Sequence, residues 1–204
     1  MNKTENNNVI ISGELITPFE FNNEIHGENF YTAKLSVKRD SGVCDEIPIT
    51  VSDRLADIKQ YAVGQNLKIS GSFRSYNKHE ETRNRLILSV FATDIEEMEE
   101  LPFADDLNEI YLDGYICKEP IYRKTPLGRE ITDMLIAVNR DYNKSDYIPC
   151  ITWGRNARFA GNLEVGTKIK IKDGFRVGFI RNCFLMVLRK IERLMKYRYR
   201  RLKL

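Results

Sequence analysis

The sequence predicts an all-β protein built from two similar domains, because it repeats itself and because each copy alternates apolar and polar residues. Residues 9–16, 33–39, 47–50 and 61–71 recur in the same order as residues 110–117, 135–140, 148–151 and 163–174, at offsets of 101 to 103. Repeated blocks in constant order indicate a duplicated structural unit. Alternation with period two, as in residues 28–39 and 130–140, is typical of half-buried strands.

The elements of each copy follow one order. Three strands come first, and a short helical stretch follows them, at residues 54–62 in the first copy and 155–164 in the second. Two more strands complete each copy, and the first of them begins near residue 65 in the first copy and near residue 167 in the second. Gly64 and Gly166 end the helical stretches. This order predicts two tandem OB-folds, which are five-stranded Greek-key barrels that bind single strands and oligosaccharides. We expect the first OB-fold at residues 8–100, an acidic linker at 101–107 and the second OB-fold at 108–204.

Composition excludes several classes of protein. The chain has 204 residues, of which 42% are hydrophobic and 30% charged, so global disorder is excluded. No apolar run reaches the roughly 18 residues that a membrane-spanning helix needs, and the polar N-terminus lacks the apolar stretch of a secretory signal. The four cysteines stand far apart without metal-ligand spacing. We therefore expect a cytoplasmic protein with reduced cysteines, no metal, no cofactor and no small-molecule substrate.

The charge is distributed unevenly between the two copies. Residues 1–106 carry a net charge of −8 and residues 107–204 a net charge of +11, of which +8 lies in residues 173–204. A basic second half suits a polyanionic ligand.

Aromatic and basic residues gather in the second copy at the places where a single strand of nucleic acid needs them. Such a ligand requires flat rings for its bases and cations along its phosphates. Tyr147 and Trp153 have the same strand parity as Pro149 and Ile151, so we expect these four residues on one face. The candidate binding residues are Tyr122, Arg123, Arg140, Tyr142, Lys144, Tyr147, Trp153, Arg155 and Arg158.

The first copy has lost most of these aromatic residues. Ser41, Glu46 and Ser52 stand where the second copy has Tyr142, Tyr147 and Trp153. At about 1–3 kcal/mol per stacked base, this loss removes most of the affinity of a short site. We therefore expect a degenerate ligand face that binds weakly or serves only as structure. Its remaining candidates for contact with the ligand are Phe73, Arg74, Tyr76 and Lys78.

Residues 108–172 resemble the bacterial single-stranded DNA-binding protein family. The family's first motif is matched by Asn108, Ile110, Leu112, Gly114, Glu119, Pro120, Arg123, Gly128, Ala137, Val138, Asn139 and Arg140. Its second motif is matched by Tyr147, Ile148, Cys150, Trp153, Gly154, Ala157, Ala160, Leu163 and Gly166.

The resemblance implies a function for the chain. It implies base-stacking positions at Tyr142, Tyr147 and Trp153, and sequence-tolerant binding of single-stranded DNA in replication, recombination or repair. It also implies a nucleoid-associated protein with four OB-folds per assembly, which a homodimer of this chain would supply.

The tail, residues 173–204, departs from the family. Taken as written, its apolar residues follow the i, i+3/i+4 spacing of an amphipathic helix with the basic side chains largely opposite, which would suit a nucleic-acid or membrane surface. If the tail is genuine, the second barrel lacks its closing strands and keeps open edges, which predicts poor stability and aggregation. Reading permitted codons of the tail one base out of register yields an ending of the family type. We interpret the tail as the product of a shifted reading frame that begins near residues 172–174.

The sequence offers two other classes of function. An OB-fold module for dimerisation or for docking within the replication machinery fits the poor first copy, the atypical tail and the lack of an acidic C-terminal tip. Catalysis is disfavoured because His26 and His79 have no nucleophile motif beside them and no phosphate-binding glycine loop is present. We therefore expect a binding protein and no enzyme.

Resequencing the gene across codons 172–174 tests the shifted frame. We expect an insertion or deletion of one base relative to close relatives. An intact frame in agreement with those relatives would show that the tail is genuine.

Overall fold

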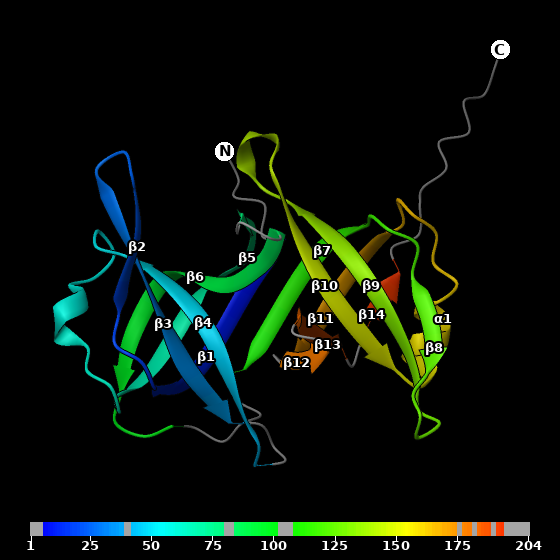
Figure 1. Cartoon of the computed structure of the whole chain (residues 1–204), viewed down its shortest axis with the longest axis horizontal. Helices are drawn as coiled ribbons and strands as arrows, with labels where there is room; N and C mark the ends of the chain where they lie inside the picture. Colours follow the sequence, from blue (N-terminus) through cyan, green and yellow to red (C-terminus); the bar gives the residue numbers. More distant parts are fainter. Residues whose placement is uncertain are drawn as a thin grey trace.

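The computed structural model describes residues 6–38, 42–79, 84–101, 108–174, 177–180, 183–188 and 191–193. Within these ranges, the strands join into one continuous sheet that curls into two barrels side by side (Figure 1). The two tandem OB-folds that the sequence predicts are thereby confirmed.

The first barrel is closed by parallel pairing between β4 (Cys44–Ser52) and β6 (Asn84–Met98). Ile49 of β4 lies opposite Val90 of β6, and β5 pairs with both β1 and β6. Its elements are β1 (Asn7–Leu15), β2 (Glu20–Ile25), β3 (Glu28–Lys38), β4 (Cys44–Ser52), η1 (Ile58–Gln60), β5 (Asn66–His79) and β6 (Asn84–Met98).

The second barrel repeats this plan. Its long hairpin, β9 and β10, pairs along its whole length, from Ser145 opposite Asn139 to Trp153 opposite Ile131. Its elements are β7 (Glu109–Ile116), β8 (Ile121–Lys124), β9 (Glu130–Asn139), η2 (Asp141–Asn143), β10 (Ser145–Trp153), α1 (Arg155–Ala160), β11 (Lys168–Gly174), β12 (Val177–Ile180), β13 (Cys183–Leu188) and β14 (Ile191–Arg193).

The helical stretch is longer in the second copy than in the first. α1 lies within the expected range 155–164, whereas 54–62 contains only the single 3-10 turn η1. The Asp57 side chain accepts a hydrogen bond from the Lys59 backbone N–H at 3.1 Å. Such a local side-chain cap starts a new turn in the middle of the expected helix and so prevents a helix across the whole segment.

The prediction of an amphipathic helix in the tail is wrong for the residues that the structure describes there, because they form the strands β12, β13 and β14. β13 runs parallel to β10, with Cys150 opposite Met186, and β14 pairs with β11. β13 thus takes the place beside β10 that β6 takes beside β4. Pairing satisfies the backbone groups of an otherwise open edge, so tertiary contacts override the helical spacing. The expectation that the second barrel lacks closing strands is wrong for the same reason, since β10 and β11 both gain partners from the tail.

The two barrels share one sheet and one hydrophobic core. β1 pairs antiparallel with β7, and Val9 lies opposite Ile110. Both residues belong to a single buried cluster that continues through the two barrels. The expected linker at 101–107 lies outside the described residues except for Leu101.

Three further features bear on the function classes. Among the described helices, none is long and apolar enough to cross a membrane. No group of three or more metal-ligating side chains comes together in the described ranges. Cys44, Cys117 and Cys150 are free thiols, and burial raises the pKa of the Cys150 thiol.

The repeated glycine of each copy has a structural reason. A Cβ atom on Gly13 would lie 2.5 Å from the Ser36 carbonyl oxygen, and one on Gly114 would lie 2.6 Å from the Ala137 carbonyl oxygen. Both distances are too short for any side chain. Strand β1 can therefore approach β3 this closely, and β7 can approach β9, only because glycine stands at these positions.

We expect Gly114→Ala to lower the free energy of unfolding by about 1–3 kcal/mol, because the added methyl group forces β7 away from β9. Urea denaturation measures the loss. Glu109→Ala, on the exposed start of the same strand, should change stability by less than about 0.5 kcal/mol. Equal effects of the two substitutions would contradict the close approach.

Candidate nucleic-acid interface

The outer face of the β9–β10 hairpin carries two exposed aromatic rings. Tyr147 is 48% exposed and Trp153 is 38% exposed, whereas the alternate residues of β10 point into the barrel. The two rings stand six residues apart on one strand, or about 20 Å. Pro149 is half-buried between them, but Ile151 is buried, so the expected four-residue face is exposed only in part.

Arg123 shares this face. It lies opposite Ile131 in the β8–β9 pair, and Ile131 lies opposite Trp153 in the β9–β10 pair. Residues directly opposite each other in antiparallel strands project from the same side of the sheet. The Arg123 guanidinium forms a bidentate pair with Asp133, with Nε 2.6 Å from Oδ2, and the hydrogen bond to Asp133 raises the pKa of Arg123.

Tyr122 and Arg158 belong to a separate cluster on the other side of β9, next to α1. The Tyr122 hydroxyl donates to Glu130 Oε1 at 2.7 Å, and Arg158 Nε donates to Glu130 Oε2 at 2.6 Å. These hydrogen bonds, with that from Tyr122 the strongest, lower the pKa of Glu130. The same contact with Glu130 raises the pKa of Tyr122. The structure therefore does not unite all the candidate residues on one surface.

The turn between β9 and β10 presents a third group. Tyr142 is 94% exposed and has a φ of 61°, the left-handed conformation that is costly for a bulky residue. The Arg140 backbone N–H donates to the Lys144 carbonyl at 2.7 Å and closes the turn around it. This turn projects beyond the second barrel at the top of Figure 1. Lys144 is exposed here, as is Arg155 at the start of α1.

The first-copy candidates differ among themselves. Phe73 is only 1% exposed and belongs to the core, so the expectation that it contacts a ligand is wrong: its place in β5 points it into the barrel. Tyr76 is 42% exposed, and burial of part of its ring raises its pKa. The Arg74 side chain is 30% exposed. Lys78 lies in β5, and its side chain is outside the described part of the structure.

Acidic residues of the site were not identified from the sequence. Glu130 and Asp133 each hold a candidate arginine, and Asp146, which is fully buried, lies 3.4 Å from both Arg74 and Arg140. One signal for Asp146 was available: Asp45 occupies the matching place in the first copy and is also buried. A carboxylate repeated at an inward position of a strand indicates a buried partner.

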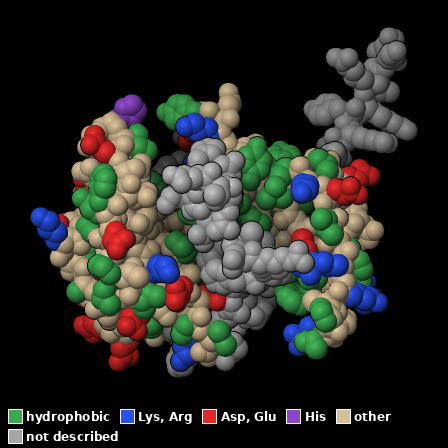
Figure 2. Space-filling view, in the orientation of Figure 1, with side chains coloured by type: hydrophobic (Ala, Val, Ile, Leu, Met, Phe, Trp, Pro, Cys, Tyr) green, Lys and Arg blue, Asp and Glu red, His purple; other side chains and the backbone are tan. Residues whose placement is uncertain are grey.

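The distribution of surface charge agrees with that of the sequence. In Figure 2 acidic side chains predominate over the first barrel, on the left, and Lys and Arg side chains gather low on the second barrel, on the right.

The second barrel matches a known family. The model of the "Single-strand binding protein family" matches residues 107–175. Single-stranded DNA-binding protein A of Bacillus subtilis is 36% identical over 63 residues, which are 28% of this chain and 37% of that protein. The single-stranded DNA-binding protein of Caldanaerobacter subterraneus is 33% identical over 72 residues, which are 32% of this chain and 48% of that protein. The chain thus spans less than half the length of these relatives.

A solved structure shows the same fold over both barrels. The wild-type single-stranded DNA binding protein from Thermus aquaticus superposes with a TM-score of 0.68 at 20% identity, covering 93% of each chain. The resemblance drawn from the sequence is confirmed.

We expect Glu130→Gln to lower the pKa of Tyr122 toward its ordinary value. The neutral amide removes the negative charge that disfavours ionisation of the hydroxyl. Titration of the tyrosine ring-carbon signals by NMR measures the shift, and Glu109→Gln serves as the control. An unmoved Tyr122 would show that the contact with Glu130 does not persist in solution.

Proposed function

We propose that the second barrel, whose residues 107–175 match the model of the single-strand binding protein family, binds single-stranded DNA without sequence preference and protects it during replication, recombination or repair. The observation that carries the proposal is the pair of exposed rings, Tyr147 and Trp153, beside Arg123 on one face of the β9–β10 hairpin. Aromatic rings stack on the face of any base, so such a site tolerates all sequences.

In this proposal the bases and the phosphates meet different residues. Bases stack on Tyr147 and Trp153, and on Tyr142 where the turn projects. Each stacked base contributes about 1–3 kcal/mol. Phosphates meet the basic residues Arg123, Arg140, Lys144, Arg155 and Arg158, and each neutralised phosphate adds about −0.7 to the log–log slope of affinity against salt.

Two of these arginines must exchange partners when DNA binds. Arg123 and Arg158 are held by Asp133 and Glu130 at 2.6 Å in pairs that water reaches. Exposed ion pairs contribute at most about 1 kcal/mol, so a phosphate can replace either carboxylate at small cost. The carboxylates keep the guanidinium groups oriented until the strand arrives.

The family match also bears on whether the protein is an enzyme and on how it assembles. Family members are binding proteins without catalytic activity. Two barrels per chain would give four in a homodimer, which we propose as the working form, bound to chromosomal DNA in the cytoplasm. A docking module without DNA binding is less well supported, because it gives no reason for exposed rings next to arginine on the second barrel.

Titration of oligo-dT while following fluorescence tests the function, since Trp153 is the single tryptophan. We expect strong quenching that high salt reverses. Tyr147→Ala should weaken binding by about 5- to 150-fold, the equivalent of one lost stack. Phe21→Ala removes a ring that is 61% exposed on β2 of the first barrel, away from the β9–β10 hairpin, and should bind as the wild type does. An unchanged Trp153 signal from folded protein at low salt would refute the proposal.

A further inference from the structure

We propose that the first barrel clamps both legs of the β9–β10 turn of the second barrel, and that this clamp positions the residues of the second barrel that bind DNA. The turn comprises residues 140–144. Its legs are Asn139 at the end of β9 and the pair Asp146 and Tyr147 at the start of β10. This inference rests on the proposed function. It gives the first barrel a part in binding that needs no contact between that barrel and DNA.

The backbone conformation of the turn requires support from outside the turn. Tyr142 and Asn143 are consecutive residues with φ angles of 61° and 56°. Asparagine tolerates this left-handed region, whereas a bulky tyrosine adopts it only at a cost. The hydrogen bond from the Arg140 N–H to the Lys144 carbonyl joins the two ends of the turn, but it does not fix where the turn lies on the barrel. Such a conformation persists where the surrounding structure holds it in place.

The β10 leg is held by β5 of the first barrel. The Tyr147 backbone N–H donates to Ser75 Oγ at 2.7 Å, and the Ser75 backbone N–H donates to Asp146 Oδ1 at 2.8 Å. Asp146 is fully buried and Ser75 is 9% exposed, so water competes little for these hydrogen bonds. This reciprocal pair fixes the position of Tyr147, one of the two stacking rings of the proposed site, relative to the first barrel.

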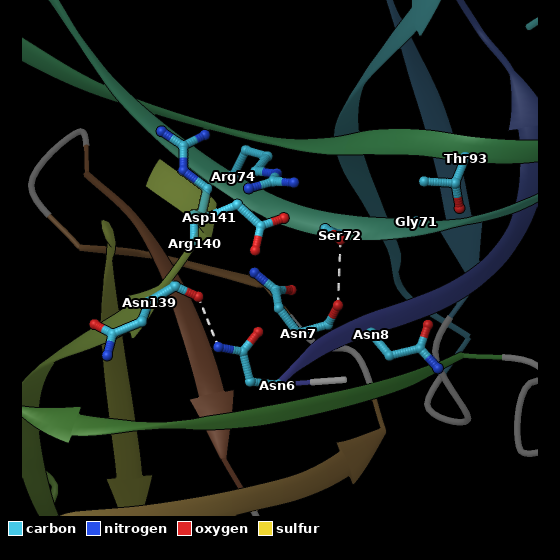
Figure 3. Close-up of a pocket in the computed structure, with 10 residues that line it drawn as sticks. All are labelled: Asn6, Asn7, Asn8, Gly71, Ser72, Arg74, Thr93, Asn139, Arg140 and Asp141. Carbon is cyan, nitrogen blue, oxygen red and sulfur yellow. Dashed lines mark hydrogen bonds between the residues drawn. The ribbon is translucent and has the colours of Figure 1, made fainter. Parts of the chain in front are cut away.

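The β9 leg is held by the N-terminal end of the first barrel. Asn6 Nδ2 donates to the Asn139 carbonyl at 2.6 Å, as Figure 3 shows. The next residue, Asn7, pairs with the backbone of Phe73 in β5: Asn7 Nδ2 donates to the Phe73 carbonyl at 2.7 Å, and the Phe73 N–H donates to Asn7 Oδ1 at 2.8 Å. Phe73 lies two residues before Ser75. The contacts on the two legs therefore belong to one hydrogen-bonded unit of the first barrel.

Four charged side chains meet at the foot of the turn, and their charges balance. Arg74 Nη1 and Arg140 Nε each lie 3.4 Å from the same oxygen of Asp146. Asp141 is the second carboxylate, and it lines a polar hollow of about 320 Å³ together with both arginines (Figure 3). Burial and the like charge of Arg140 lower the pKa of Arg74, and the charges of Asp146 and Asp141 oppose this effect. Two guanidinium groups and two carboxylates leave no excess positive charge, so the contribution of the cluster to binding is to fix the turn.

The clamped segment contains groups that the proposed function uses. Asp146 anchors Arg140 at Nε and thereby sets where its guanidinium group lies. Lys144 and Tyr142 stand between the two clamped legs, and Tyr147 is part of one leg. Groups that are fixed before the ligand arrives lose less conformational freedom on binding, which increases affinity. In this way the first barrel increases the affinity of a site that lies on the second.

Replacement of Ser75 by valine and by threonine tests the clamp, because the two new side chains have nearly the same shape and differ in the hydroxyl group. Ser75→Val leaves the Tyr147 N–H without its acceptor, so fewer molecules hold the turn in the binding conformation. We expect the affinity for oligo-dT, followed by quenching of Trp153, to fall about tenfold, which corresponds to a tenfold smaller competent fraction. Ser75→Thr keeps the hydroxyl and should bind within about twofold of the wild type.

The dependence of binding on salt separates positioning from direct contact with phosphate. Loss of one phosphate contact changes the log–log slope of affinity against salt by about 0.7. A smaller competent fraction weakens binding while the bound state keeps all its contacts, so Ser75→Val should retain the slope of the wild type. A slope that becomes shallower by about 0.7 in Ser75→Val would show that a contact of the bound state is lost, and would overturn the inference.

Asn6→Ala releases the β9 leg without a change in the hydrophobic core. We expect this variant to bind oligo-dT about threefold more weakly, the equivalent of one lost hydrogen bond. Asn8→Ala replaces an exposed asparagine of β1 and serves as the matched control, which should bind as the wild type does.

The outcomes that contradict the clamp differ from those that contradict the proposed function. Affinity equal to that of the wild type in a Ser75→Val variant that is folded by circular dichroism would overturn the inference. If that variant does not fold, Asn6→Ala decides, and an unchanged affinity overturns it. Absence of Trp153 quenching in the wild type at low salt would instead refute the proposed function. The two failures are therefore distinguishable.

Discussion

The antiparallel pairing of β1 with β7 is the constraint on which the rest of the structure depends. Val9 and Ile110 meet across this junction, and each strand also pairs within its own barrel. A sheet that continues from one barrel to the next fixes their relative orientation through backbone hydrogen bonds. That orientation brings β5 of the first barrel against β10 of the second, where Ser75 and Asp146 meet. Without the junction, Asp146 would lose its partners from the first barrel, the Ser75 backbone N–H and the Arg74 guanidinium.

Much of the fold was predictable from the sequence, because the repeat and the period-two alternation report the burial of every second side chain in a strand. The matching of Gly13 with Gly114 even marked where two strands cross closely. The failures lie where local pattern and tertiary contact disagree. An Asp57 cap shortens the first helix to one turn, and free edges at β10 and β11 recruit the tail as strands despite its helical spacing. The periodicity of a segment does not show which strand edges elsewhere in the fold are unpaired and can pair with that segment.

The sequence was sufficient to predict which aromatic residues of the candidate site are exposed. It was less informative about which of the site residues lie together on one face. Tyr147 and Trp153 face outward, as strand parity indicates, but Phe73 has the inward parity of β5 and packs in the core. The division between the Arg123–Asp133 pair and the Glu130 cluster depends on strand register, which no residue spacing in this sequence reveals. Asp146 contacts Arg74, which lies 72 positions earlier in the chain. Such a contact becomes visible only when the relative position of the two barrels is known.

The difference between the two faces gives the molecule a direction. In a symmetric pair of identical barrels, the two-fold axis makes both ends of the pair equivalent. Here Glu46 and Ser52 replace Tyr147 and Trp153 across the junction, so the ends are chemically distinct. The two ends of one chain therefore offer different surfaces to any partner. In the homodimer proposed above, the two-fold axis would make the two chains point in opposite directions, so the assembly would have no direction of its own.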